Sequence, residues 1–142
     1  FWLYCEQMEG FMEFLNPSTM EVVASVTSWM SRSGWTAGKW LGSVPPGTYL
    51  VRVKPGFCLS RVTGPVTLSG SQNVRVSMSN FLRGDVDGDN EVGPGDFSML
   101  AMAFLSGEGD ANWNTRADLD FDKEVGPGDF SILANNFLLA GE

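Results

Sequence analysis

The stretch GDVDGDNEVGPGDFSMLAMAFLSG (residues 84–107) decides the fold of the C-terminal part of this chain, because it returns 33 residues later as ADLDFDKEVGPGDFSILANNFLLA (residues 117–140). The two segments are identical at 15 of 24 aligned positions, which indicates an internal duplication. In each copy, alternating acidic residues precede GPGDF, and apolar residues with helical spacing follow it. Each copy is therefore predicted to form a loop followed by a helix.

The acidic positions of each copy have the spacing of a calcium-binding loop of the EF-hand type. Calcium takes about six to eight oxygen ligands, and a loop of this type supplies them from alternate positions and from position 12. Carboxylates at this spacing would repel one another without a cation, so we predict one Ca²⁺ in each loop, two ions in all. The predicted ligands are Asp85, Asp87, Asp89, Glu91 (through its carbonyl) and Asp96 in the first copy, and Asp118, Asp120, Asp122, Glu124 (through its carbonyl) and Asp129 in the second.

The two loops differ at position 6, where the chain must turn sharply. This position is usually Gly, but it is Asn90 in the first copy and Lys123 in the second. Asn tolerates a left-handed backbone, whereas Lys does so much less readily. We therefore expect the second site to be the more strained one.

Composition and charge exclude several classes of function. The chain of 142 residues contains no His, which removes the usual general base and the commonest zinc ligand, so we expect no enzyme. Residues 81–142 carry thirteen acidic and three basic residues, whereas residues 1–80 carry four acidic and six basic ones. Nucleic acid is a poor partner because the basic residues do not cluster. No apolar run approaches the roughly 20 residues that span a bilayer, so no membrane span is expected.

Two domains are predicted, with residues 1–80 forming an all-β antiparallel sandwich and residues 81–142 an α-helical calcium-binding domain. Turn-forming residues separate short segments of the first domain that are rich in Val, Thr and Trp. In residues 48–54, Tyr49, Val51 and Val53 share one face, while Arg52 and Lys54 point the other way. Further strands are expected within 20–29, 34–44, 62–70 and 73–78, giving six or seven strands.

The two-copy pattern, with DxDxD at the front of each loop, Asp at position 12 and one helix after each loop, resembles the type I dockerin modules of extracellular bacterial assemblies over residues 83–140. This resemblance implies calcium-dependent folding and docking to a cohesin partner through the loop and helix faces. Dockerins often carry Ser-Thr at loop positions 10 and 11, where this chain has Pro94-Gly95 and Pro127-Gly128. Through PPGTYLVRVKPG (45–56), the first domain resembles the carboxypeptidase-regulatory, transthyretin-like sandwich, whose members are non-catalytic.

The N-terminal residues are unusually apolar. FWLYCEQM (1–8) is interpreted either as a central strand of its own sandwich or as a strand added to a neighbouring subunit. The start at Phe1 indicates a processed form or a fragment. Cys5 and Cys58 fit no metal motif, so they form either a disulfide, as in an oxidising compartment, or two buried thiols.

These observations favour a secreted, non-catalytic structural protein at the cell surface of a bacterium. It would assemble into a filament with copies of itself, or bind a cell-surface or cohesin-type protein. The competing hypothesis is an accessory fragment of a larger secreted hydrolase that docks to a cohesin-type partner. Stacking of Trp side chains on a carbohydrate is a further alternative to their packing in the core. The candidate assembly residues are Phe1, Trp2, Leu3, Tyr4, Met99 and Met102.

Overall fold

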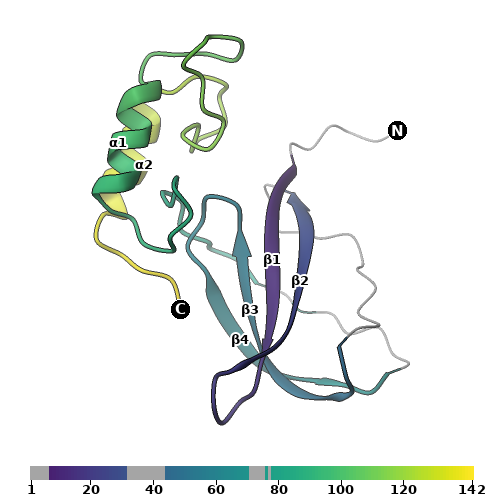
Figure 1. Ribbon diagram of the computed structural model, residues 1–142. Coiled ribbons are helices and arrows are strands. Elements are labelled where there is room, and N and C mark those ends of the chain that lie inside the picture. Colours follow the sequence, from purple (N-terminus) through teal and green to yellow (C-terminus); the bar gives the residue numbers. More distant parts are fainter. Residues whose placement is uncertain (1–6, 32–43, 71–75, 77) are drawn as a thin grey trace. The chain divides into compact units, whose positions relative to one another are not determined.

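The computed structural model describes residues 7–31, 44–70, 76 and 78–142, and Figure 1 shows how their strands and helices run. The strands are β1 (Gln7–Leu15), β2 (Val22–Ser31), β3 (Gly47–Pro55) and β4 (Arg61–Leu68), and the helices are α1 (Pro94–Ala103) and α2 (Pro127–Asn135). Among these residues, neither helix combines the length and the apolar character that crossing a bilayer requires.

The described residues fall into two compact units. The unit that holds the sheet comprises the described residues up to Pro55, together with Ser60–Phe81 and Glu142, and we call it the sheet unit. The unit that holds both helices comprises Gly56–Leu59 and Leu82–Gly141, and we call it the helix unit. The division into domains 1–80 and 81–142 stays a prediction.

The sheet is antiparallel, with strand order β2-β1-β3-β4 (Figure 1). The turn between β1 and β2 is closed by Asn16, whose side-chain oxygen accepts hydrogen bonds from the backbone N–H groups of Ser18 (2.8 Å) and Thr19 (3.2 Å). Such Asx turns let a short polar side chain replace a backbone partner. Asn16 thereby fixes the turn that joins β1 to β2.

One face of the sheet carries its core. Because side chains alternate along a strand, the predicted face of Tyr49, Val51 and Val53 is buried, with exposures of 7%, 1% and 8%. Phe14 lies opposite Val51, and its ring meets that of Tyr49 edge to face at 5.8 Å. The core cluster consists of Phe14, Val26, Val44, Tyr49, Val51 and Val53, with Met12, Ala24, Val66, Leu68, Met78 and Phe81 packed against it.

The face of the sheet opposite the core carries charged side chains, one of which is buried. Glu13 and Arg52 are directly paired across β1 and β3, and their side chains form an ion pair at 2.9 Å. Lys54 lies on the same face, as the alternation predicts, yet it is only 6% exposed. A lysine buried to this extent has its ammonium group as well as its alkyl chain largely removed from water.

The PPGTY segment that opens β3 is held by its own tyrosine. The Tyr49 hydroxyl donates a hydrogen bond of 2.9 Å to the backbone carbonyl of Pro45. A side chain at Gly47 would lie 3.0 Å from that hydroxyl, so the glycine leaves room for the ring. This hydrogen bond fixes the conformation of the chain where β3 begins.

The strands differ from the sequence-based expectation in two respects. β1 spans Gln7–Leu15, so the strand predicted within residues 1–8 overlaps it at residues 7 and 8, whereas the part over residues 9–15 was not predicted. The glutamates of β1 obscure the alternation that places Met12 and Phe14 on the core face. The described residues form one four-stranded sheet, so the antiparallel character is confirmed and the second sheet of a sandwich is not. Most of the strands expected at 34–44 and 73–78, and residues 1–6, lie outside the described residues.

Truncating the core aromatic should destabilise the sheet unit strongly. We expect Phe14→Ala to lower the free energy of unfolding by about 3–5 kcal/mol, because Phe14 is 2% exposed and its removal leaves a cavity in the core cluster beside Tyr49. Val22→Ala on β2, where the side chain is 50% exposed, is the control and should cost less than about 0.5 kcal/mol. Urea unfolding measures both variants, and equal losses would contradict this account of the core.

Candidate metal centre

Each helix begins within the last residues of its loop, and one aspartate belongs to both the loop and the helix. Gly93 and Gly126 cap the N-termini of α1 and α2, and a proline follows at the first helical position of each, where its missing N–H is not needed. The third helical residue, Asp96 or Asp129, accepts a hydrogen bond from the capping N–H at 2.6 or 2.7 Å. Position 12 of each loop is therefore also a helix cap.

The aspartates at positions 1 and 12 are buried, with Asp85, Asp96, Asp118 and Asp129 between 0% and 4% exposed. A buried carboxylate is costly unless its oxygens are satisfied. Backbone amides of the same loop supply the partners: Gly88 and Asn90 to Asp85, Asp87 to Asp96, Asp122 and Lys123 to Asp118, and Leu119 and Asp120 to Asp129. Each loop is wrapped around its own carboxylates.

Positions 1, 3 and 12 of each loop converge. Carboxylate oxygens of Asp85, Asp87 and Asp96 lie within 4.8 Å of one another, and the same holds for Asp118, Asp120 and Asp129. Oxygen-only donor sets suit hard cations, and the number and charge of these ligands fit Ca²⁺. The donor chemistry therefore fits the predicted ion, with the position 1 and 12 carboxylates held in place and the position 3 carboxylate at the surface.

The remaining predicted ligands do not join these triads. Asp89 and Asp122 each accept a hydrogen bond from the backbone N–H of the residue two positions later, Glu91 or Glu124, at 2.9 Å. The side chains of both glutamates are exposed, in keeping with the prediction that only their carbonyls coordinate. Their role as ligands stays a prediction.

Loop 1 (residues 85–96) and loop 2 (residues 118–129) each form backbone hydrogen bonds with the segment that follows the helix of the other repeat. The buried position 8 valine of loop 1, Val92, accepts a hydrogen bond from Leu138 N–H and donates one to the Leu139 carbonyl, both at 2.8 Å. Val125 of loop 2 makes the equivalent bonds. Its carbonyl accepts a hydrogen bond from Leu105 N–H at 2.7 Å, and its N–H donates one to the Ser106 carbonyl at 2.8 Å. The two repeats are thereby tied into one structure.

Two arginines, also 33 residues apart, make a second reciprocal connection. Arg83, ahead of loop 1, donates a hydrogen bond of 2.7 Å to the carbonyl of Leu119 in loop 2. Arg116, ahead of loop 2, donates to the carbonyl of Val86 in loop 1. The sequence analysis missed both residues, although extending the repeat by one residue towards the N-terminus would have revealed them.

The left-handed backbone expected at position 6 is present in both loops, with φ of 73° at Asn90 and 74° at Lys123. The backbone at position 4 is left-handed too, with φ of 92° at Gly88 in loop 1 and 67° at Phe121 in loop 2. The residue types differ more at this position than at position 6, because a glycine in loop 1 is replaced by an aromatic residue in loop 2. Side chains make this conformation unfavourable by roughly 1–2 kcal/mol per residue. Loop 2 thus combines two unfavourable positions, Phe121 and Lys123.

The other predicted sites are only partly within the described residues. Cys58 is buried and Cys5 lies outside them, so the disulfide stays a prediction. Of the assembly residues, Met102 is 77% exposed and Met99 half-buried, while residues 1–4 lie outside.

Burial, together with the crowding of carboxylates, raises the pKa of three of them. Partial burial, followed by repulsion from Asp96, Asp89 and Asp85, raises the pKa of Asp87. In loop 2, burial and then repulsion from Asp129 raise the pKa of Asp118 and of Asp120. These groups hold protons in the folded, metal-free chain at a pH where the unfolded chain has released them.

The metal-free protein should therefore lose stability as pH rises. Between the ordinary aspartate pKa of about 3.9 and the raised folded values, the folded state binds more protons, so the free energy of unfolding falls with increasing pH. Urea unfolding of metal-free protein between about pH 4 and pH 7 measures this slope. Asp118→Asn should flatten it, and an unchanged slope in that variant would contradict the assignment.

The helix unit matches a known family. Residues 83–138 match the family described as the dockerin type I domain. No curated protein matches the chain.

Two solved structures share the fold. They are crystal structures of a type II cohesin–X–dockerin complex from Acetivibrio cellulolyticus, one a C-terminal and one an N-terminal interface mutant. The similar chains are 22% and 21% identical to this one, each with a TM-score of 0.62, and each match covers 93% of this chain and 82% of the other. At this identity the likeness concerns the fold alone. Together with the duplicated loops and helices, the family match identifies residues 83–138 as a dockerin-like segment.

Proposed function

We propose that this chain is an extracellular, non-catalytic interaction protein whose dockerin-like segment binds two calcium ions and docks onto a cohesin-type partner. The observation that carries the proposal is a set of large apolar side chains that are exposed on the helices of that segment or directly after them. We call it the helix face, and its residues are Phe97, Met102, Leu105, Phe130 and Leu138, with exposures of 45%, 77%, 80%, 43% and 79%.

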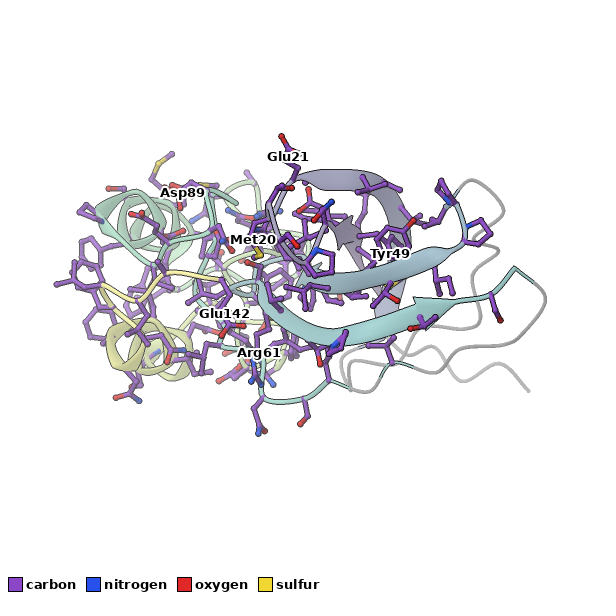
Figure 2. All side chains as sticks on the ribbon, turned by 90° about the horizontal axis from the view of Figure 1, so that it is seen from below. Met20, Glu21, Tyr49, Arg61, Asp89 and Glu142 are labelled. Carbon is purple, nitrogen blue, oxygen red and sulfur yellow. The ribbon has the colours of Figure 1, made fainter. Side chains whose placement is uncertain are left out.

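The helix face is built from equivalent residues of the two repeats. Phe97 at the start of α1 and Phe130 at the start of α2 meet edge to face, with ring centroids 6.2 Å apart. The two helices overlap in the view of Figure 1, and Figure 2, turned by 90°, shows them side by side. Leu105 and Leu138, which follow the helices, are likewise equivalent. Apolar side chains gathered on a surface in this way mark interaction sites more often than solvated surface.

The choice of partner follows from the comparisons. Residues 83–138 match a dockerin family, and the similar structures are complexes in which a dockerin is bound to a cohesin. The helices carry no Lys or Arg, so the partner surface should be apolar at its centre. We propose that the sheet unit accompanies the dockerin-like segment without catalysis; attachment of a larger hydrolase and self-assembly into a filament remain the alternatives.

Calcium should stabilise the helix unit and leave the sheet unit unchanged. Ions that bind only the folded state at about 100 times their Kd contribute about 2.7 kcal/mol per site, so chelation should lower the melting temperature of the helix unit. Asp85→Ala and Asp118→Ala should each reduce the calcium stoichiometry from two to one in isothermal titration calorimetry. Identical melting in calcium and in chelator would contradict the metal assignment.

Charging the helix face should abolish docking. The double variant Phe97→Asp/Phe130→Asp should weaken binding to immobilised type I and type II cohesin modules by at least about 100-fold, since central aromatic residues dominate such interfaces. Val22→Asp in the sheet unit, where the side chain is also exposed, is the matched control and should bind normally. Calcium titrations of both variants should show two sites.

Sedimentation equilibrium in calcium separates the alternatives. If wild type binds no cohesin module, cohesin docking is wrong. If it instead forms oligomers that Phe97→Asp/Phe130→Asp dissolves, self-assembly through the helix face replaces it.

A further inference from the structure

A short segment that precedes the dockerin-like repeats by more than 20 residues belongs to the same compact unit. Gly56–Leu59 connects β3 to β4 in the sequence, yet it clusters with Leu82–Gly141. Its backbone pairs with the entry to loop 1. Leu59 N–H donates to the Leu82 carbonyl at 2.8 Å, and the Phe57 carbonyl accepts from Gly84 N–H at 3.1 Å, on either side of an antiparallel bridge between Cys58 and Arg83.

The side chain of Phe57 reaches loop 2 rather than loop 1. Phe57 is 7% exposed, and its ring centroid lies 5.4 Å from that of Phe121, at an interplanar angle of 53°. The guanidinium of Arg83 lies over the Phe121 ring, 4.7 Å from its centroid, and donates to the Leu119 carbonyl. Two residues outside loop 2 therefore hold one of its side chains.

Phe121 is the residue of loop 2 that most needs this support. It stands at position 4 with φ of 67°, where loop 1 has Gly88, which adopts positive φ without steric cost. The next two amides, those of Asp122 and Lys123, donate to the buried Asp118 carboxylate at 3.1 Å each. The conformation of Phe121 thus sets the direction of the amides that hold the position 1 carboxylate.

We propose that Phe57 is a positioning residue for the second calcium loop, and that Gly56–Leu59, which lies outside the family-matched residues 83–138, completes the dockerin-like unit. The ring contact offsets the unfavourable backbone of Phe121 and keeps loop 2 in its folded conformation. Loop 1, with Gly88 in place of Phe121, does not need it. The proposal rests on the calcium binding proposed above.

Full-length variants with one functional loop test this proposal. Asp85→Ala leaves only loop 2 and Asp118→Ala leaves only loop 1, and each is titrated with Ca²⁺ with and without Phe57→Ala. We expect Phe57→Ala to raise the Kd of loop 2 by about tenfold, the scale of a lost aromatic pair, and that of loop 1 by less than about threefold. Phe57→Leu, which keeps an apolar contact, should restore most of the loop 2 affinity.

Testing Phe57→Ala in a second variant distinguishes the positioning of Phe121 from a general loss of stability. In Phe121→Gly, which removes both the ring and the unfavourable backbone, Phe57→Ala should no longer affect loop 2. Equal weakening of both loops, or an effect that persists in Phe121→Gly, would overturn the proposal.

Amide hydrogen exchange of metal-free protein gives a readout that does not depend on calcium. Phe57→Ala should accelerate exchange at Asp122 and Lys123, and it should leave unchanged the loop 1 amides that donate to Asp85, those of Gly88 and Asn90. If neither single-loop variant binds calcium, the proposed function fails, and the exchange rates still decide the role of Phe57. Unchanged exchange at Asp122 and Lys123 would overturn it.

Discussion

The repulsion among buried carboxylates is the constraint on which the helix unit depends. Two aspartates in each loop are almost completely removed from solvent, and a third carboxylate oxygen lies within 4.8 Å of theirs. Their charges are tolerated because backbone amides point at them, and amides can do so only if the chain curls tightly. The left-handed positions, the proline and glycine before each helix, and the helix caps all follow from that requirement.

The same constraint explains why charge is distributed so unevenly along the sequence. The sheet unit is held by apolar alternation and by the cross-strand ion pair of Glu13 with Arg52, and it has no need for clustered acids. In the helix unit, Arg83 and Arg116 each donate to a backbone carbonyl of the opposite loop. Because they bond to the main chain, they lend positive charge to the region without neutralising a metal ligand directly.

Much of this architecture could be predicted from local patterns, and the failures share a cause. The loops, both helices and strands β2, β3 and β4 follow from spacing and alternation that are visible within about ten residues. The part of β1 over residues 9–15 was not predicted because Glu9 and Glu13 interrupt its apolar pattern. The contact of Phe57 with Phe121 joins residues that are distant in sequence, so no local pattern signals it.

The exchange of hydrogen bonds between the repeats has a consequence for their origin. Val92 is bonded to the end of the second repeat and Val125 to the end of the first, so one repeat alone would leave its position 8 valine without these partners. Two separate copies of a single loop and helix could satisfy the same bonds as a symmetric homodimer. The present unit is in effect such a dimer joined by a covalent connection through residues 108–115. Shortening that connection below the span it bridges would favour an intertwined, domain-swapped pair of chains over the closed monomer.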